Sequence, residues 1–220
     1  MRLLDLVLPQ RCLVCGTGGE LVCPRCHIAL PRIAGPLCAR CGAPTAWPVS
    51  RCRECSGRRV AFASAHAAVA YDAAVRAVIA AWKERGLRRL ASLAAELVVE
   101  QVARPDVVAL AFVPPDRDRS RWQGHHPAER LAAELAERWQ LPVLPLLERT
   151  RALRRQRGLS LADRRRNVVG GFRAVTCPPP RVGLVDDVYT SGATAAAAAS
   201  ALRKAGARRV EVVTFARAVR

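Results

Sequence analysis

The sequence predicts an α/β fold, in which a parallel β-sheet flanked by helices follows a small cysteine-rich module. Three observations predict it. Short apolar stretches alternate with segments of helical periodicity between residues 58 and 220. Four C-x-x-C pairs lie within residues 12–55, and residues 181–194 join an apolar strand, an acid pair and a small-residue loop. We therefore expect two domains, residues 1–57 and residues 58–220.

The composition is that of a globular chain. Its 220 residues are 51% hydrophobic and 25% charged, which is enough to bury a core. No apolar run approaches the roughly 20 residues that span a bilayer, so we expect no membrane insertion. The apolar stretch at residues 1–12 is short and contains Asp5, unlike a signal peptide. These features favour a cytoplasmic protein.

The cysteine pairs predict metal binding. In a chain without an export signal, C-x-x-C pairs more often hold a metal than form disulfides. Two such turns supply the four sulfurs of a tetrahedral zinc site. The spacing suits two structural Zn²⁺ sites in series, although a cross-braced pairing stays open. The ligands would be Cys12, Cys15, Cys23 and Cys26 in one site and Cys38, Cys41, Cys52 and Cys55 in the other.

The remaining chain alternates helices and strands. Apolar residues at helical spacing predict helices over residues 75–82, 87–98 and 131–135, and an alanine-rich helix that ends at Lys204. Pro127 favours the first position of the third helix. Continuous apolar runs predict buried parallel strands at residues 107–113, 142–147, 182–185 and 210–215. Ligands of such sheets bind at the carboxyl ends of the strands.

Residues 181–194 predict a site for a phosphorylated sugar. A strand ends in Asp186 and Asp187, and the loop Thr190–Thr194 leads into a helix. Backbone N–H groups of a glycine-containing loop and a helix N-terminus favour a phosphate. The two carboxylates can accept hydrogen bonds from the vicinal hydroxyls of a sugar.

This run, VGLVDDVYTSGAT, resembles the motif that binds phosphoribosyl pyrophosphate (PRPP) in type I phosphoribosyltransferases. The whole chain resembles the ComF family, in which a cysteine-rich zinc module precedes a phosphoribosyltransferase domain. A KxxG element at residues 83–86, a glycine at Gly124 and a basic segment also carry the resemblance. In that segment the matching positions are Gln156, Leu159, Ser160, Arg164, Asn167, Val168, Gly171 and Phe172.

The resemblance implies transfer of a phosphoribosyl group from PRPP, bound with Mg²⁺, to an unknown acceptor. Asp186 and Asp187 would be the catalytic pair that holds the ribose hydroxyls. The 5-phosphate would lie on Thr190, Ser191, Gly192, Ala193 and Thr194, and the pyrophosphate would face Lys83, Pro115, Asp116 and Arg117. Arg151, Gln156 and Arg164 would belong to a mobile cover. The resemblance further implies a role in competence and DNA uptake, with single-stranded DNA or competence proteins as partners.

One departure from the family bears on turnover. Where relatives carry R-x-x-G-F-N-Q, residues 121–127 read RWQGHHP, so that histidine and proline replace two amides. Whether this protein turns over an acceptor is therefore left open.

The charge of the chain supports a second hypothesis. The formal net charge is +18, and residues 149–173 alone hold nine arginines and one acid. Such a segment can cover a pyrophosphate or hold a nucleic-acid backbone. The alternative is thus a non-catalytic nucleic-acid-binding zinc-ribbon protein with a phosphoribosyltransferase-like fold.

Overall fold

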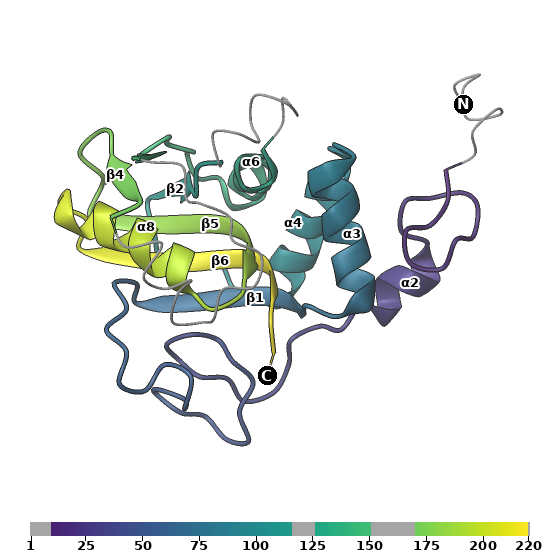
Figure 1. Ribbon diagram of the computed structural model, residues 1–220, viewed down its shortest axis with the longest axis horizontal. Coiled ribbons are helices and arrows are strands. Elements are labelled where there is room, and N and C mark those ends of the chain that lie inside the picture. Colours follow the sequence, from purple (N-terminus) through teal and green to yellow (C-terminus); the bar gives the residue numbers. More distant parts are fainter. Residues whose placement is uncertain (1–9, 116–125, 151–169, 220) are drawn as a thin grey trace.

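The computed structural model describes residues 10–115, 126–150 and 170–219 of the chain (Figure 1). At its centre lies a four-stranded sheet with the strand order β1-β6-β5-β2, in which every pairing is parallel. The strands are β1 (Ser64–Ala70), β2 (Ala109–Phe112), β5 (Arg181–Tyr189) and β6 (Arg209–Arg217). Val143 adds a parallel bridge to Leu110 beyond β2. The predicted parallel sheet is confirmed.

Helices cover both faces of this sheet. Side chains of β5 and β6 alternate between two buried clusters, as the period of a strand requires. Val185 and Val213 lie in one cluster, with residues of α3 (Ala73–Glu84), α4 (Leu90–Gln101) and α6 (Pro127–Trp139). Leu184 and Val212 lie in the other, with α8 (Ala193–Lys204) and with β3 (Leu147–Arg149) and β4 (Phe172–Ala174), which pair antiparallel.

The predicted helices form for the reasons that the sequence gives. Asp72 caps α3 by accepting a hydrogen bond from the Val75 N–H at 2.8 Å. Pro127 opens α6, in which Leu131 and Leu135 are buried. The apolar stripe of α3 is buried throughout, at Val75, Val78, Ile79 and Trp82.

Three strands differ from expectation. β1 has the sequence SAHAAVA, in which Val69 alone favours a strand, and it is extended because its backbone pairs with β6. The predicted strand at residues 142–147 is only the bridge at Val143, followed by β3. β5 continues through the acid pair to Tyr189, because β6 is long enough to pair with it that far.

The cysteine-rich residues form two knuckles, the first at residues 12–26 and the second at residues 38–55. The first includes part of α2 (Pro24–Ala29) and packs with the cluster of α3 and α4. The second packs with the cluster of α8 and β5. In Figure 1 the two are well separated, one beside the base of α3 and the other below β1. The domain boundary after residue 57 stays a prediction.

None of the helices in the described residues is both long and apolar enough to cross a membrane.

Candidate functional site

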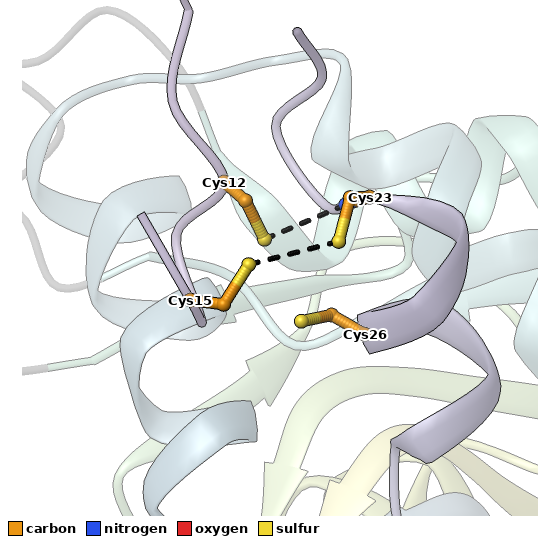
Figure 2. Close-up of side chains that lie close together, drawn as sticks. All are labelled: Cys12, Cys15, Cys23 and Cys26. Carbon is orange, nitrogen blue, oxygen red and sulfur yellow. Dashed lines mark hydrogen bonds between the residues drawn. The ribbon is translucent and has the colours of Figure 1, made fainter. Parts of the chain in front are cut away.

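The first knuckle brings four cysteine sulfurs together. Figure 2 shows Cys12, Cys15, Cys23 and Cys26 pointing toward a common centre, the last two from the start of α2. The Sγ atoms of Cys15 and Cys23 lie 3.7 Å apart. A tetrahedral zinc with Zn–S bonds of about 2.3 Å requires sulfurs about 3.8 Å apart. The group fits zinc, and its ligands come from consecutive pairs rather than from a cross-braced arrangement.

The second knuckle has the same geometry and is buried more deeply. The Sγ atoms of Cys38 and Cys55, and those of Cys41 and Cys52, lie 3.5 Å apart. Three of these four residues are at most 3% exposed, whereas Cys15 of the first knuckle is exposed. Four sulfurs leave no open coordination position, so both groups fit structural zinc.

Backbone amides favour the thiolate form in each knuckle. Burial opposes ionisation of Cys12, but N–H groups of Cys23, Cys15 and Val14 outweigh it and lower the pKa of Cys12 to about 6. In the same way, amides of the second knuckle overcome burial and lower the pKa of Cys38 to about 7. The thiolate is the form that binds zinc, so these amides favour metal binding at Cys12 and Cys38. The hydrogen bond with Cys15 raises the pKa of Cys26 to about 12, and burial raises that of Cys55 to about 11.

The acid pair lies where β5 loses one of its neighbours. β2 pairs with β5 as far as Phe112 and Val185, and the carboxylates follow at once. Asp187 lies within 2.5 Å of Lys83, measured from Oδ2 to Nζ, and its own N–H donates to Asp186 Oδ1 at 2.9 Å. Lys83, which the sequence resemblance placed facing the pyrophosphate, lies in the last turn of α3 and forms an ion pair with Asp187.

The pKa of Asp186 is raised from its ordinary value. Burial of this carboxyl and, next, the negative charge of Asp187 raise its pKa to about 7, although Lys83 and Arg149 act in the opposite direction. A carboxyl group that titrates near neutral pH inside a cleft is a common feature of functional sites.

The loop after β5 turns sharply into α8. Gly192 adopts φ 70° and is the N-cap residue of α8, while Ser191 Oγ accepts a hydrogen bond from the Ala193 N–H at 3.4 Å. A positive φ costs glycine little, which explains its place here. The loop of residues 190–192 therefore leads directly into the N-terminus of α8, an end of a helix that favours anions.

Four predicted residues surround one small hollow beside this loop. Its volume is about 10 Å³, which holds about one water molecule. A phosphate is larger, so it could bind only on the solvent side of the loop or after the loop had moved. Thr214 of β6, which pairs with Asp186, also lines it and was missed from the sequence, because only strand register reveals it. The predicted residues in the lining are Asp186, Thr190, Gly192 and Thr194.

Tyr189 packs against Gly192 of the loop, and it was not identified as a site residue from the sequence. It is 5% exposed, and a Cβ atom added to Gly192 would collide with its hydroxyl. Phe62 meets its ring edge to face at 6.3 Å, and the Arg217 guanidinium lies 5.1 Å from its centre. The side chain is thus fixed between the loop and the chain that leaves the second knuckle.

The remaining predicted residues fall at the end of β2 and in the basic segment. The N–H of Val113, just after β2, donates to the Val185 carbonyl at 2.9 Å. Pro115 follows two residues later, next to the end of β5 where the acid pair lies. Arg149 Nε donates to the Pro114 carbonyl at 2.9 Å. Five predicted positions, Asp116, Arg117, Arg151, Gln156 and Arg164, lie outside the described residues, as do Gly124 and most of the predicted cover.

The structure gives the departure from the family motif a local role. His126 precedes α6, and its Nδ1 accepts a hydrogen bond from the Glu129 N–H at 3.2 Å. Its ring also lies 5.8 Å from that of Phe112. His126 and Pro127 together therefore begin the helix.

Three comparisons with known proteins bear on the chain. Residues 3–56 match the double zinc ribbon domain family. Competence protein F of Haemophilus influenzae is 34% identical over 144 residues, which cover 62% of this chain and 62% of that protein. The solved structure of glutamine PRPP amidotransferase from B. subtilis, complexed with ADP and GMP, is 25% identical over 58% of this chain and 25% of its own, with a TM-score of 0.38.

The zinc ribbons and the parallel sheet define a protein in which a double zinc ribbon precedes an α/β domain. More narrowly, it is similar to Competence protein F over 62% of the length of that protein, in agreement with the sequence resemblance.

Proposed function

We propose that the protein binds PRPP with Mg²⁺ at the carboxyl end of β5 and transfers its phosphoribosyl group to an acceptor. The observation that carries the proposal is the succession of Asp186, Asp187 and the loop of residues 190–194, with Lys83 on the second acid. Carboxylates suit the ribose hydroxyls, and loop amides at a helix N-terminus suit the 5-phosphate.

The proposed reaction needs positioning and charge neutralisation more than covalent help from the protein. The bond from C1 of the ribose to pyrophosphate breaks, and its electron pair leaves with pyrophosphate. A nucleophilic atom of the acceptor forms the new bond to C1 and loses its proton. The carboxylates would fix the sugar as C1 becomes cation-like, and Lys83 would offset the charge of the leaving group.

The ion pair between Lys83 and Asp187 adds a condition to binding. Their 2.5 Å contact occupies the carboxylate that would accept from the ribose. PRPP would therefore draw the ammonium toward the pyrophosphate as the hydroxyls take its place on Asp187. This exchange preserves a partner for each charged group, so neither is left desolvated and unpaired.

Calorimetric titration of the purified protein with PRPP and Mg²⁺ tests the proposal. We expect binding by the wild-type chain and no detectable binding by a variant with Asp186→Asn and Asp187→Asn. Loss of two hydrogen bonds to charged acceptors costs about 3–6 kcal/mol, which removes a micromolar affinity.

A matched variant controls for the change of charge. Glu96→Gln with Glu137→Gln also removes two carboxylates, both of them exposed and on helices α4 and α6. It should bind PRPP as the wild type does. Equal affinity in the acid-pair variant and the wild type would refute the assigned site, and wild-type protein without PRPP affinity would refute the function.

A second candidate function is nucleic-acid binding, and a basic hollow favours it. Four arginines line a hollow of about 280 Å³ between the second knuckle and the end of α8, namely Arg40, Arg203, Arg208 and Arg209. Single-stranded DNA binding that weakens steeply with salt would support this function. The acid-pair variant separates the two functions, because it should bind DNA at least as tightly as the wild type.

A further inference from the structure

The second knuckle is joined to the candidate phosphate loop by a hydrogen bond across the chain. Arg58, three residues after Cys55, donates from Nη2 to the Ser191 carbonyl at 2.9 Å. The same side chain donates from Nη1 to the Glu54 carbonyl at 3.4 Å, within the knuckle itself. One guanidinium thus links the knuckle backbone to the loop backbone.

A second link passes through a buried arginine at the end of β6. Arg217 is 1% exposed, and it donates to the Cys41 carbonyl and reaches Glu54 Oε2 at 3.4 Å. Its guanidinium also lies 5.1 Å from the centre of the Tyr189 ring. The hydroxyl of that tyrosine packs against Gly192. Cys41 is one of the four cysteines of the second knuckle. A residue of that group therefore fixes the position of Arg217, which in turn contacts Tyr189 under the loop.

The first knuckle makes its polar contacts with other elements. Arg32, which follows it, donates to the carbonyls of His27 and Ile28 at 2.8 Å and 3.2 Å. It also pairs with Glu100 of α4 at 3.5 Å. These contacts join the first knuckle to the helices on the opposite face of the sheet from α8.

We propose that the second knuckle, held together by zinc, positions the loop of residues 190–194 and so sets the affinity of the proposed PRPP site. Arg58, Arg217 and Tyr189 are the positioning residues. The inference rests on the proposed function for its ligand, but the ordering of the loop can be measured without that ligand.

The physical reason is that so small a knuckle needs its metal to hold a single conformation. Without the metal, Cys41 and Glu54 no longer have fixed positions, and Arg217 loses both of its fixed partners. Arg58 then has no fixed base from which to hold the Ser191 carbonyl. A loop that must order its own amides before it binds a phosphate binds more weakly.

A matched pair of cysteine variants tests the inference in the full chain. Cys52→Ser and Cys15→Ser each remove one accessible ligand, the first from the second knuckle and the other from the first. We expect Cys52→Ser to weaken PRPP binding at least tenfold and to speed amide exchange at residues 190–194. Cys15→Ser should change both by less than threefold, while each variant loses one zinc by metal analysis.

Arg58 variants decide the question if Cys52→Ser unfolds the chain. Arg58→Ala should retain both zinc ions, speed exchange in the loop and weaken PRPP binding severalfold. Arg58→Lys keeps one donor but lacks the two-nitrogen fork that reaches both carbonyls, so its affinity should lie between those of Arg58→Ala and the wild type.

The outcomes separate the inference from the proposed function. Loop exchange and affinity that stay at wild-type values in both Cys52→Ser and Arg58→Ala would overturn the inference. Absence of PRPP binding by the wild type would overturn the proposed function alone, because loop exchange in the variants would still decide whether the knuckle positions the loop.

Discussion

The two knuckles share a cysteine pattern but differ in what surrounds them. The first has an exposed ligand, Cys15, and is joined to α4 through the partly exposed side chain of Arg32. The second has three fully buried ligands, and the buried Arg217 joins it to the end of the sheet. Two similar cysteine groups therefore have different surroundings, one beside the helices and the other beside the candidate phosphate loop.

The arginines that anchor the knuckles show the energetic side of this difference. A partly exposed ion pair such as Arg32–Glu100 contributes about 0–1 kcal/mol. Removing one partner of a buried charge contact, as at Arg217, typically costs about 3–5 kcal/mol. The second knuckle is thus tied to the sheet much more strongly than the first is tied to its helices.

Metal removal is the change with the largest expected effect. We expect two zinc ions per chain, and structural zinc contributes about 10–16 kcal/mol apparent in small fingers. A chelator should release them in two phases, the faster from the first knuckle because Cys15 is exposed. Absorbance of a zinc-sensitive dye follows this release.

Cysteine variants identify the two phases. Cys15→Ser should remove the fast phase, and Cys177→Ser should leave both, since Cys177 belongs to neither cluster. A fast phase that survives Cys15→Ser and disappears in Cys52→Ser would reverse the assignment. A zinc content near zero with oxidised cysteines would refute both sites.

Equivalent glycines in the two knuckles give a smaller and more local test. Gly16 and Gly42 each follow a C-x-x-C pair, with φ of 78° and 66°. A Cβ added at Gly16 meets nothing within 4 Å, whereas one added at Gly42 would collide with the Ala65 carbonyl of β1. Gly16→Ala should cost about 1–2 kcal/mol for the backbone conformation alone. Gly42→Ala should cost about 1–3 kcal/mol more, because the knuckle must shift from the sheet.

Chemical denaturation of both variants at saturating zinc measures this difference. Equal free energies of unfolding for the two would show that the second knuckle moves freely against β1, and would remove the contrast between the knuckles.

The smallest expected effect is the pH dependence of stability that Asp186 of β5 contributes. The folded state raises the pKa of Asp186 to about 7 from an ordinary value near 3.8. Between these values the folded chain holds more protons than the unfolded chain, so stability falls as pH rises. Asp186→Asn removes that fall, and it should raise Tm at pH 8 by about 2–4 °C, or about 1 kcal/mol.

The gain should become smaller at pH 5, where Asp186 is protonated in the folded wild type. Scanning calorimetry of Asp186→Asn and of the exposed control Glu96→Gln at both pH values tests this. A gain of the same size at pH 5 and pH 8 would show that a cause other than the buried charge stabilises the variant.

Several features of the protein follow from the sequence by itself. The spacing of the cysteines dictates two metal sites, because a C-x-x-C turn aims two sulfurs at one point whatever surrounds it. The apolar stripe from Val75 to Trp82 and the proline before α6 are local signals, and both helices form as predicted. The acid pair, the loop and α8 are also contiguous, so the candidate phosphate site could be recognised before any tertiary contact was known.

The rest was decided by the tertiary structure. β1 is a strand only because β6 lies beside it, since its alanines have no strong preference for an extended backbone. The sequential pairing of the cysteine groups could not be separated from a cross-braced one by spacing alone. The link from Arg58 to Ser191 joins residues 133 positions apart, and that from Arg217 to Cys41 joins residues 176 positions apart. No local pattern encodes such contacts, because they exist only once the sheet places the end of β6 and the loop after β5 against the second knuckle.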